Sequence, residues 1–414
     1  MSAVSQSPTP VPEGSIFKLT GFRTIWFGQL VSIFGDFIAL FAIISLITFR
    51  WHGTPVQVTA MTIAYVSPLA FIGPPAGVLV DHWNVKRVMI ASDLTRAVLV
   101  LALVWVVNVR QIAAVMFAVS IMSSAFMPAQ SITIRTLVPR DRLLKANAVL
   151  SQAFYLIRIG APVAAAALVG WAGERVCFYV DAASFLFSAL MISTLTIHRP
   201  PREGADKTLR GLTADFKEGN RFIFTHPGLS FVFMAMAVAM FVMSAFAPLI
   251  SIFVRDALHA GTFMYGVVSG MIGVGLIAGT TMIVKISGGK PKPGVVLVGL
   301  LSLGVATAVL AASRYPVIAA ISTFLLGFSI SMVLIPAQTM SQRETPHNMV
   351  GRVSSTFMSM ISIAQILGLL LSGVLAQRLG MVRLFAACAV ALGVISFGGW
   401  IFLRSRPQPA ESAA

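Results

Sequence analysis

Between two long apolar runs stands the segment Gly77-Val-Leu-Val-Asp81-His-Trp-Asn84-Val-Lys86-Arg87, and each of these runs is long enough to cross a bilayer. Gly77 lets one helix approach another closely because it has no Cβ. Asp81 falls at the predicted end of that helix, and Asn84 can adopt the left-handed conformation that a tight reversal needs. Lys86 and Arg87 open the next helix with positive charge, which predicts that this loop is cytoplasmic.

The composition indicates a polytopic membrane protein. Of the 414 residues, 57% are hydrophobic and 11% are charged, whereas soluble domains carry about 25% charged residues. A water-soluble fold would leave most of this apolar surface exposed to water. Both cysteines, Cys177 and Cys388, lie inside apolar runs, so neither a disulfide framework nor a metal site is predicted.

Twelve apolar runs have the length of roughly 20 residues that crosses about 30 Å of hydrocarbon. They predict an all-α membrane protein with twelve transmembrane helices. The predicted spans are 24–49, 56–80, 88–108, 111–133, 146–170, 176–197, 229–251, 263–284, 294–312, 315–337, 353–376 and 382–403.

The basic residues predict the orientation of the chain. The net charge is +16, and 21 of the 30 Lys and Arg residues fall on the side of the termini, against 7 on the opposite side. This excess predicts that both termini are cytoplasmic. The positive charge is therefore a topology signal and a surface for anionic lipid, and nucleic acid is not needed to explain it.

The spans divide the chain into five regions. We expect a disordered cytoplasmic tail at 1–20, an N-terminal six-helix half at 21–198, a central cytoplasmic linker at 199–228, a C-terminal six-helix half at 229–404 and a disordered tail at 405–414. The first fifteen residues do not have the pattern of a secretory signal. Within the linker, Leu212, Phe216 and Ile223 recur at about helical spacing, which predicts a short amphipathic helix on the membrane surface.

An internal repeat relates the two halves. The segment Met127-Pro-Ala-Gln, followed by Arg135, recurs 208 residues later as Ile335-Pro-Ala-Gln, followed by Arg343. Both copies close the fourth predicted span of their six. The repeat predicts two pseudo-symmetric six-helix halves, an arrangement that many transporters build around a site near the midplane.

Residues 77–87 resemble the loop between helices 2 and 3 of the major facilitator superfamily, whose pattern is Gly-x-x-x-Asp-Arg-x-Gly-Arg-Lys. The Gly, Asp and Lys positions agree, whereas His82, Asn84 and Val85 stand where the pattern has Arg, Gly and Arg.

A second segment narrows the resemblance. It runs Phe126-Met-Pro-Ala-Gln and then Leu137-Val-Pro-Arg-Asp-Arg-Leu-Leu-Lys-Ala-Asn-Ala. It is similar to a bacterial efflux branch that includes siderophore exporters and macrolide efflux pumps, and lysophospholipid transporters look related. The resemblance covers essentially the whole chain. It implies the major facilitator fold in the inner membrane and export of an amphipathic or hydrophobic small molecule (a drug-like compound or a siderophore) by alternating access with proton antiport. Two alternatives stay open: a lysophospholipid flippase and a non-transporting membrane receptor.

Asp36 is the leading candidate for a proton-coupling residue. It lies 13 residues past Arg23 and therefore about 20 Å into the first span. Gln29, Ser32 and Asp36 recur at helical spacing, which predicts a polar stripe facing a central cavity. Desolvation favours the protonated acid, so Asp36 can load and release a proton; the alternative is a carboxylate permanently paired with an arginine. The resembling families often carry Gly-Asp here, which matches Gly35 and Asp36.

Arg158 lies 13 residues past Lys145, at a similar predicted depth, and shares a helix face with Tyr155. A guanidinium keeps its charge at any useful pH, so it needs a partner, which can be Asp36, a substrate anion or backbone carbonyls. A structural ion pair and a substrate contact are both open. The Gly-Ala-Pro segment that begins at Gly160 resembles the antiporter motif of helix 5, which has Gly in place of this Ala.

Three more charged residues lie inside predicted spans. Asp93 and Arg96 are three apart on one helix face, which predicts a mutually neutralising pair. Asp181, near the outer end of the sixth span, is either a second proton-coupling site or a helix cap.

Asp81 resembles the gate residue of the family. A carboxylate there can lie near the N-terminus of the eleventh span, or near Arg352, and hold one conformer closed; the alternative is a solvated helix-end charge. Gly77, Asp81, Lys86 and Arg87 form the predicted gating motif.

Two further stripes complete the predicted cavity. Met236, Met240 and Met243 share one face of the seventh span, and flexible methionines suit varied apolar ligands, although ordinary helix packing is the alternative. Gln365 lies on a polar face of the eleventh span. The predicted substrate cavity consists of Gln29, Ser32, Asp36, Tyr155, Arg158, Met236, Met240 and Gln365.

The sequence has no Gly-x-x-x-x-Gly-Lys-Ser/Thr loop, no His-Glu-x-x-His and no Gly-x-Ser-x-Gly, so we do not expect an enzyme. No cofactor or metal is expected. The expected partners are a small amphipathic substrate, protons and membrane lipids, not nucleic acid, and the chain is expected to be a monomer.

Overall fold

The fold is known from a computed structural model, which describes residues 16–139, 142–197, 218, 220–287, 293–346 and 349–404. The C-terminal tail, residues 1–15 of the predicted N-terminal tail, and Leu212 and Phe216 of the predicted linker helix lie outside the described residues, whereas 16–20 form η1 and the beginning of α1. Ile223, the last of the three residues from which that helix was predicted, is helical and fully buried.

The N-terminal half is a bundle of helices, and polar caps mark the beginnings of three of them. Thr54 and Gln57 form a capping box at the start of α2, and Asn84 and Asn108 accept hydrogen bonds from the first turns of α4 and α5. The elements are η1 (Ile16–Lys18), α1 (Thr20–Ser45), the π-helix η2 (Leu46–Arg50), α2 (Pro55–Phe71), α3 (Gly73–His82), α4 (Val85–Ala102), η3 (Leu103–Trp105), α5 (Val109–Leu137), α6 (Leu143–Ala172) and α7 (Glu174–Ser193).

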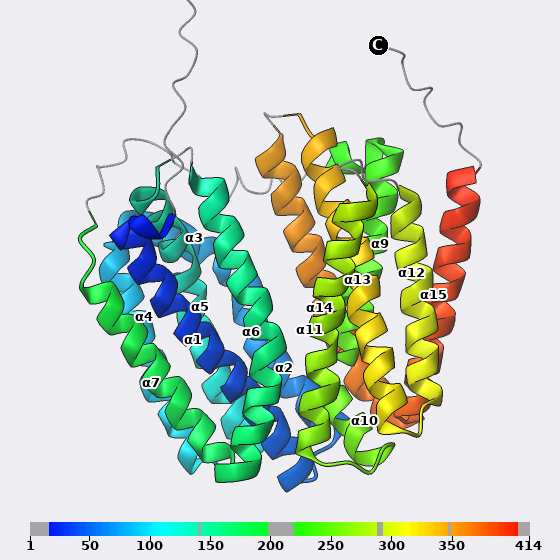
Figure 1. Cartoon of the computed structure of the whole chain (residues 1–414), viewed down its shortest axis with the longest axis horizontal. Helices are drawn as coiled ribbons and strands as arrows, with labels where there is room; N and C mark the ends of the chain where they lie inside the picture. The colour runs from blue at the N-terminus through cyan, green and yellow to red at the C-terminus, as the bar shows by residue number, and fades with distance from the viewer. Residues whose placement is uncertain are drawn as a thin grey trace, which may run out of the picture.

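The C-terminal half is a second helical bundle beside the first (Figure 1). Its helices are α9 (Pro227–Phe246), α10 (Ile250–Asp256), α11 (Thr262–Ser287), α12 (Pro293–Ala312), α13 (Pro316–Glu344), α14 (Val350–Leu379) and α15 (Met381–Arg404). The predicted seventh span, 229–251, is interrupted by a turn after Phe246, and the short helix α10 continues the chain beyond it.

Eleven helices of the described chain are long and apolar enough to cross a membrane. The predicted second span, 56–80, is instead two shorter helices, α2 and α3, that meet at Ile72. Pro68 lies inside α2, and prolines occupy the first turn of α3. Because proline has no N–H and clashes with the preceding turn, a cluster of prolines breaks an apolar run that hydropathy alone reads as one helix.

The two halves are related by a pseudo-twofold arrangement. Helix α6 packs on α11 and helix α2 packs on α14, so each half gives its second and fifth span to the contact (Figure 1). The repeated Pro-Ala-Gln segments occupy matching places in α5 and α13, which are both 29 residues long. Both helices continue past their proline, so the segments lie inside the helices rather than at their ends.

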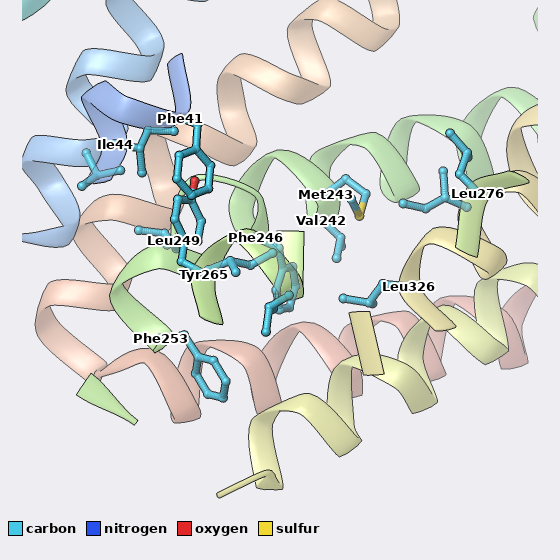
Figure 2. Packing of buried hydrophobic residues seen from close by; sticks show 14 of the residues in the cluster. Phe41, Ile44, Val242, Met243, Phe246, Leu249, Phe253, Tyr265, Leu276 and Leu326 are labelled. Atoms are coloured by element: carbon cyan, nitrogen blue, oxygen red, sulfur yellow. The ribbon is translucent and has the colours of Figure 1, made fainter. Parts of the chain in front are cut away.

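Side chains join the halves at the end of the molecule opposite the C-terminus, where Figure 1 shows α10. The hydroxyls of Thr48 and Ser251 lie 2.9 Å apart, and the Arg255 guanidinium donates to the carbonyl oxygens of Thr48 and Gly53 at 2.7 and 3.0 Å. Phe41 of α1 stacks on Tyr265 of α11, with ring centroids 4.5 Å apart (Figure 2). These contacts close that end of the molecule between the two halves.

Candidate functional site

A buried charge cluster lies inside the N-terminal half. Arg96 on α4 forms an ion pair with Asp93, one turn earlier on the same helix, and its second terminal nitrogen lies 4.0 Å from the carboxylate of Asp36 on α1. Asp93 is 0% exposed and Arg96 is 4% exposed. The Arg96 guanidinium therefore connects α4 to α1 and also neutralises Asp93 on its own helix.

Two aromatic rings enclose the Arg96 guanidinium. Its central carbon lies 4.5 Å from the ring centroid of Phe126 on α5 and 4.3 Å from that of Phe185 on α7. An aromatic face attracts a cation, most strongly where water is excluded. The cation is thus held by four helices at once, α1, α4, α5 and α7.

Asp181 on α7 is the third carboxyl group of this region and is 1% exposed. The hydroxyl of Ser184 donates to its main-chain carbonyl at 2.7 Å and lies 3.2 Å from its carboxylate. A Cβ placed on Gly35 would lie 2.7 Å from that carboxylate and would overlap Ser184. Gly35 therefore lets α1 approach α7 closely enough to bring Asp36 and Asp181 into one cluster.

The charges in this cluster do not balance. In the part of the chain that the structure describes, three carboxyl groups (Asp36, Asp93 and Asp181) share one guanidinium, that of Arg96. An uncompensated charge in the membrane interior is costly, so the excess acid favours bound protons. The side chain of Asp36 is 28% exposed, which makes it the most accessible of the three.

A cavity of about 130 Å³ lies between the two halves. Its walls are apolar and aromatic, with Arg158 as a charged residue, and Figure 2 shows Phe41 and Tyr265 packed together at this boundary. The lining residues are Phe37, Leu40, Phe41, Ile44, Arg158, Pro162, Met243, Ala247, Ile250, Tyr265, Ser269, Ile272 and Gly273. This composition fits a small ligand with an apolar body.

The cavity and the charge cluster meet on α1. Phe37 follows Asp36 directly, and Leu40 lies one helical turn further along the same face. A ligand in the cavity therefore contacts the same helix that carries the accessible carboxylate.

The structure separates residues that the sequence analysis placed together. Gln29 and Ser32 are buried in the N-terminal half and are not among the described residues that line the cavity, because their face of α1 packs within the bundle. Asp36 is likewise not among the residues described as lining this cavity, and its carboxylate lies 4.0 Å from the Arg96 guanidinium. The guanidinium near Asp36 belongs to Arg96, whereas Arg158 lines the cavity.

The three methionines predicted to line the cavity also lie in different places. Met243 lines the cavity, whereas Met236 is 1% exposed in the core of the C-terminal half. Gln365 on α14 reaches the sulfur of Met240 at 4.0 Å. Neither Met236, Met240 nor Gln365 is among the lining residues described for this cavity. The side chain of Tyr155 lies outside the part of the chain that can be described.

The predicted gating motif lies at the junction of α3 and α4. Gly77 faces Pro128 of α5, with 3.9 Å between a Cβ placed on it and the proline Cβ, and the Lys86 ammonium donates to the main-chain carbonyl of Ser193 at 2.7 Å. Asp81 lies in the last turn of α3, and its side chain is outside the description, as is that of Arg352. Arg87 is exposed, and its main-chain N–H donates to the side-chain oxygen of Asn84.

The expectation that Asn84 is left-handed is wrong. Its φ is −71°, and its side-chain oxygen accepts a hydrogen bond from the main-chain N–H of Arg87 at 3.1 Å. Asn84 is the N-cap of α4, because an asparagine there satisfies an unpaired donor of the first turn. The reversal needs no positive φ at this residue.

Several residues of the site were missed at the sequence level. Phe126, Phe185 and Ser184 enclose the cluster, and Tyr65 on α2 lies within electrostatic range of Asp36, Arg96 and Asp181. The cavity adds Phe37 and Tyr265. The available signal was weak, since aromatic and serine residues occur in most spans of this chain.

The fold and site define a multi-pass membrane transporter: two helical bundles with reciprocal contacts, a cavity between them and a charge cluster beside it. Residues 15–413 match the family model of the transmembrane secretion effectors, a branch of the major facilitator superfamily. The chain belongs to this family, in agreement with the resemblance found in its sequence.

Relatives and solved structures agree with this assignment. The MFS-type transporter YfiS of Bacillus subtilis is 27% identical over 405 residues, which cover 93% of this chain and 94% of YfiS. Macrolide efflux protein A of Streptococcus pyogenes is 26% identical over 379 residues, 87% of this chain and 90% of that protein. The crystal structure of a bacterial homologue of the human lysosomal transporter Spinster shares the fold, with a TM-score of 0.73 at 12% identity over 96% of this chain and 100% of that one.

Proposed function

We propose that this transporter is a proton-coupled exporter of an amphipathic or hydrophobic small molecule that works by alternating access. Both termini are cytoplasmic, the chain lies in the bacterial inner membrane, and α2 and α3 together form the twelfth crossing. The excess of basic residues on the side of the termini supports this orientation. The efflux activity in the name of macrolide efflux protein A supports export.

The observation that carries the proposal is the imbalance of three carboxyl groups around one guanidinium, next to the cavity. With all three ionised, the cluster carries two excess negative charges inside a membrane-spanning bundle, and two of the three carboxyl groups, those of Asp93 and Asp181, are buried. Proton binding relieves this excess, and access to water restores it. Asp36 exchanges the proton because it is the accessible member, and Asp181 is a second acceptor behind it.

Coupling follows from the attachment of α1 to α4. An ionised Asp36 attracts Arg96, whereas a protonated Asp36 does not hold the guanidinium in the same way. The proton therefore changes the position of α1, which also carries the Phe37 and Leu40 side of the cavity. A ligand and a proton that favour different positions of α1 compete, and this competition is the basis of exchange.

The present conformation is the one closed at the outer end. The Arg255 hydrogen bonds and the stacking of Phe41 on Tyr265 hold the halves together there. Export requires these contacts to open while the cytoplasmic ends approach one another.

The test uses purified protein in sealed liposomes that contain a pH-sensitive dye. An imposed proton gradient is challenged with lipophilic cations, macrolides, catecholate siderophores and lysolipids. We expect substrate-dependent proton flux that disappears in Asp36→Asn and persists in Glu174→Gln. Glu174 is a suitable control because its partner Arg50 is 60% exposed, so the pair contributes little. Substrate movement that is indifferent to the proton gradient would contradict the proposal.

A further inference from the structure

We infer that the ligand of the cavity is an organic anion: an apolar, largely aromatic body that bears a negatively charged group held by Arg158. The inference deepens the proposed function and rests on its claim that this cavity takes the substrate. It begins from the charges at the cavity wall. Of the thirteen residues described as lining the cavity, Arg158 carries the formal charge and none is acidic.

The charge of Arg158 is permanent. A guanidinium does not lose its proton in a protein, and its planar set of N–H groups matches a carboxylate, sulfonate or phosphate. Arg158 and Pro162 present one face of α6 to the cavity. An intramembrane cation at a ligand cavity is expected to act on the ligand.

Close helix packing holds that face of α6 in place. A Cβ placed on Gly273 of α11 would lie 3.1 Å from the Cα of Ile159, and one placed on Gly270 would lie 3.1 Å from Val163. These contacts flank Arg158 and Pro162 along the helix. The guanidinium thus extends from a backbone that α11 fixes, so the positive charge is positioned before a ligand arrives.

None of the three acidic residues of this region is among the residues described as lining the cavity. Asp93 and Asp181 are buried in the N-terminal half, and Asp36 faces Arg96. A cationic ligand would therefore meet like charge at the wall and would have no lining carboxylate to pair with. Such an arrangement selects by repulsion as well as by attraction.

The rest of the wall fits an aromatic body. Phe37, Phe41 and Tyr265 supply ring surfaces, and Ser269 adds a hydroxyl near the tyrosine. Aromatic side chains contribute large apolar contact areas to a ligand.

Charge balance then makes the transport electrogenic. If one proton enters for each monovalent anion that leaves, two elementary positive charges move inward per cycle. One-for-one exchange of a proton for a monovalent cation moves none. An inside-negative membrane potential should therefore accelerate export of the anion.

The test uses three fluorescent probes that differ in one terminal group: dansyl-4-aminobutyrate, its primary amide, and N-dansyl-1,4-diaminobutane. Their charges near neutral pH are negative, neutral and positive. Binding is measured by dansyl fluorescence with purified protein, and uptake into inverted proteoliposomes is measured with and without a valinomycin-set potential. The variants are Arg158→Gln, Arg158→Lys and, as a charge-matched control, Arg110→Gln, which alters an exposed arginine near the start of α5.

We expect the wild-type protein to bind the anion about tenfold more tightly than the amide, the ratio typical of a charge-assisted contact. Arg158→Gln should bring this ratio close to one, whereas Arg158→Lys keeps a preference and Arg110→Gln leaves it unchanged. The lysine variant separates loss of charge from loss of fold.

Each of three results would overturn the inference. The first is binding of the cationic probe that equals or exceeds that of the anion, the second is an anion preference that survives Arg158→Gln, and the third is no measurable binding of the anion. Proton-driven transport of the cationic probe would also overturn the inference that the ligand is an anion, but it would leave the proposed function of proton-coupled export intact. Arg158-dependent anion binding without any proton-driven flux would support the inference and count against the proposed function.

Discussion

The Arg96 guanidinium on α4 lies 4.0 Å from the Asp36 carboxylate on α1, and it also pairs with Asp93 on its own helix. The first contact joins two helices, and the second neutralises a fully buried carboxylate by pairing with one of its two oxygens. The two contacts differ in whether their carboxylate is accessible to solvent. Asp93 has no access to water, whereas Asp36 is partly exposed, so the contact with Asp36 can open and close with protonation.

Replacing Arg96 should destabilise the protein strongly. In Arg96→Gln the buried Asp93 loses its cation, and breaking a buried pair by removing one partner costs about 3–5 kcal/mol. The aromatic contacts with Phe126 and Phe185 are lost as well. Thermal unfolding in detergent measures the effect, with Arg110→Gln as the control for loss of an exposed arginine. A melting temperature equal to that of the control would show that Arg96 does not hold the cluster together.

Gly35 should not tolerate a side chain. In Gly35→Ala the new methyl group would overlap Ser184 and approach the Asp181 carboxylate, and overpacking of this kind costs about 1–3 kcal/mol. The matched control is Gly170→Ala, since a Cβ there meets nothing within 4 Å. We expect loss of stability and of transport in the first variant alone. If Gly35→Ala behaves like Gly170→Ala, the close approach of α1 to α7 is not as described.

The contacts between the halves at the α10 end should open during transport, and a disulfide there should hold them closed. Ser45 and Thr262 have hydroxyls 3.1 Å apart across the two halves, so Ser45→Cys with Thr262→Cys should form a disulfide in a background without Cys177 and Cys388. The cross-link should stop transport, and a reducing agent should restore it. The single cysteine variants serve as controls.

Arg255→Ala should slow this cross-linking. Without its hydrogen bonds to the carbonyls of Thr48 and Gly53, the α10 end of the molecule should spend more time open. The rate of disulfide formation, followed by gel mobility, reports the closed fraction. Full transport in the cross-linked protein would refute alternating access at this end.

Glu344, beyond the membrane-spanning part of α13, gives the stability a pH dependence. Glu344 is exposed, and partial desolvation by its surroundings raises its pKa above the ordinary glutamate value of 4.5, while the nearby His226 offsets part of the rise. The folded state therefore binds this proton more tightly than the unfolded state, so stability falls as pH rises from about 4.5 through the raised pKa. Glu344→Gln should remove this part of the pH dependence. Melting temperatures of the wild type and of Glu344→Gln, measured across this pH interval, test the direction of the effect. A wild-type melting temperature that rises with pH relative to that of the variant would contradict it.

The sequence was a good guide to what depends on local composition. Long apolar runs predicted eleven of the membrane-crossing helices closely, and the repeated Pro-Ala-Gln segment indicated that the chain is built from related halves. The break at Ile72 was missed, because an apolar run hides the effect of Pro68 and the prolines that follow Gly73. Hydropathy measures transfer into lipid and carries no information on helix continuity.

The charge cluster could be predicted only in parts. The spacing of Asp93 and Arg96 indicated a pair on one helix, and depth in the span singled out Asp36. That Arg96 also reaches Asp36 depends on how α4 packs against α1. Such contacts between helices have no fixed spacing along the chain, so the sequence left Arg158 as a partner for Asp36.

The central claim is that Asp36 exchanges the proton that drives export. The most direct test compares uphill transport with substrate exchange in proteoliposomes of Asp36→Asn, using a compound that the wild-type protein exports. We predict that the variant cannot accumulate this compound against its gradient in response to a proton gradient, but still exchanges labelled for unlabelled compound at equilibrium. Proton-driven accumulation by Asp36→Asn at the wild-type rate would contradict the role of Asp36.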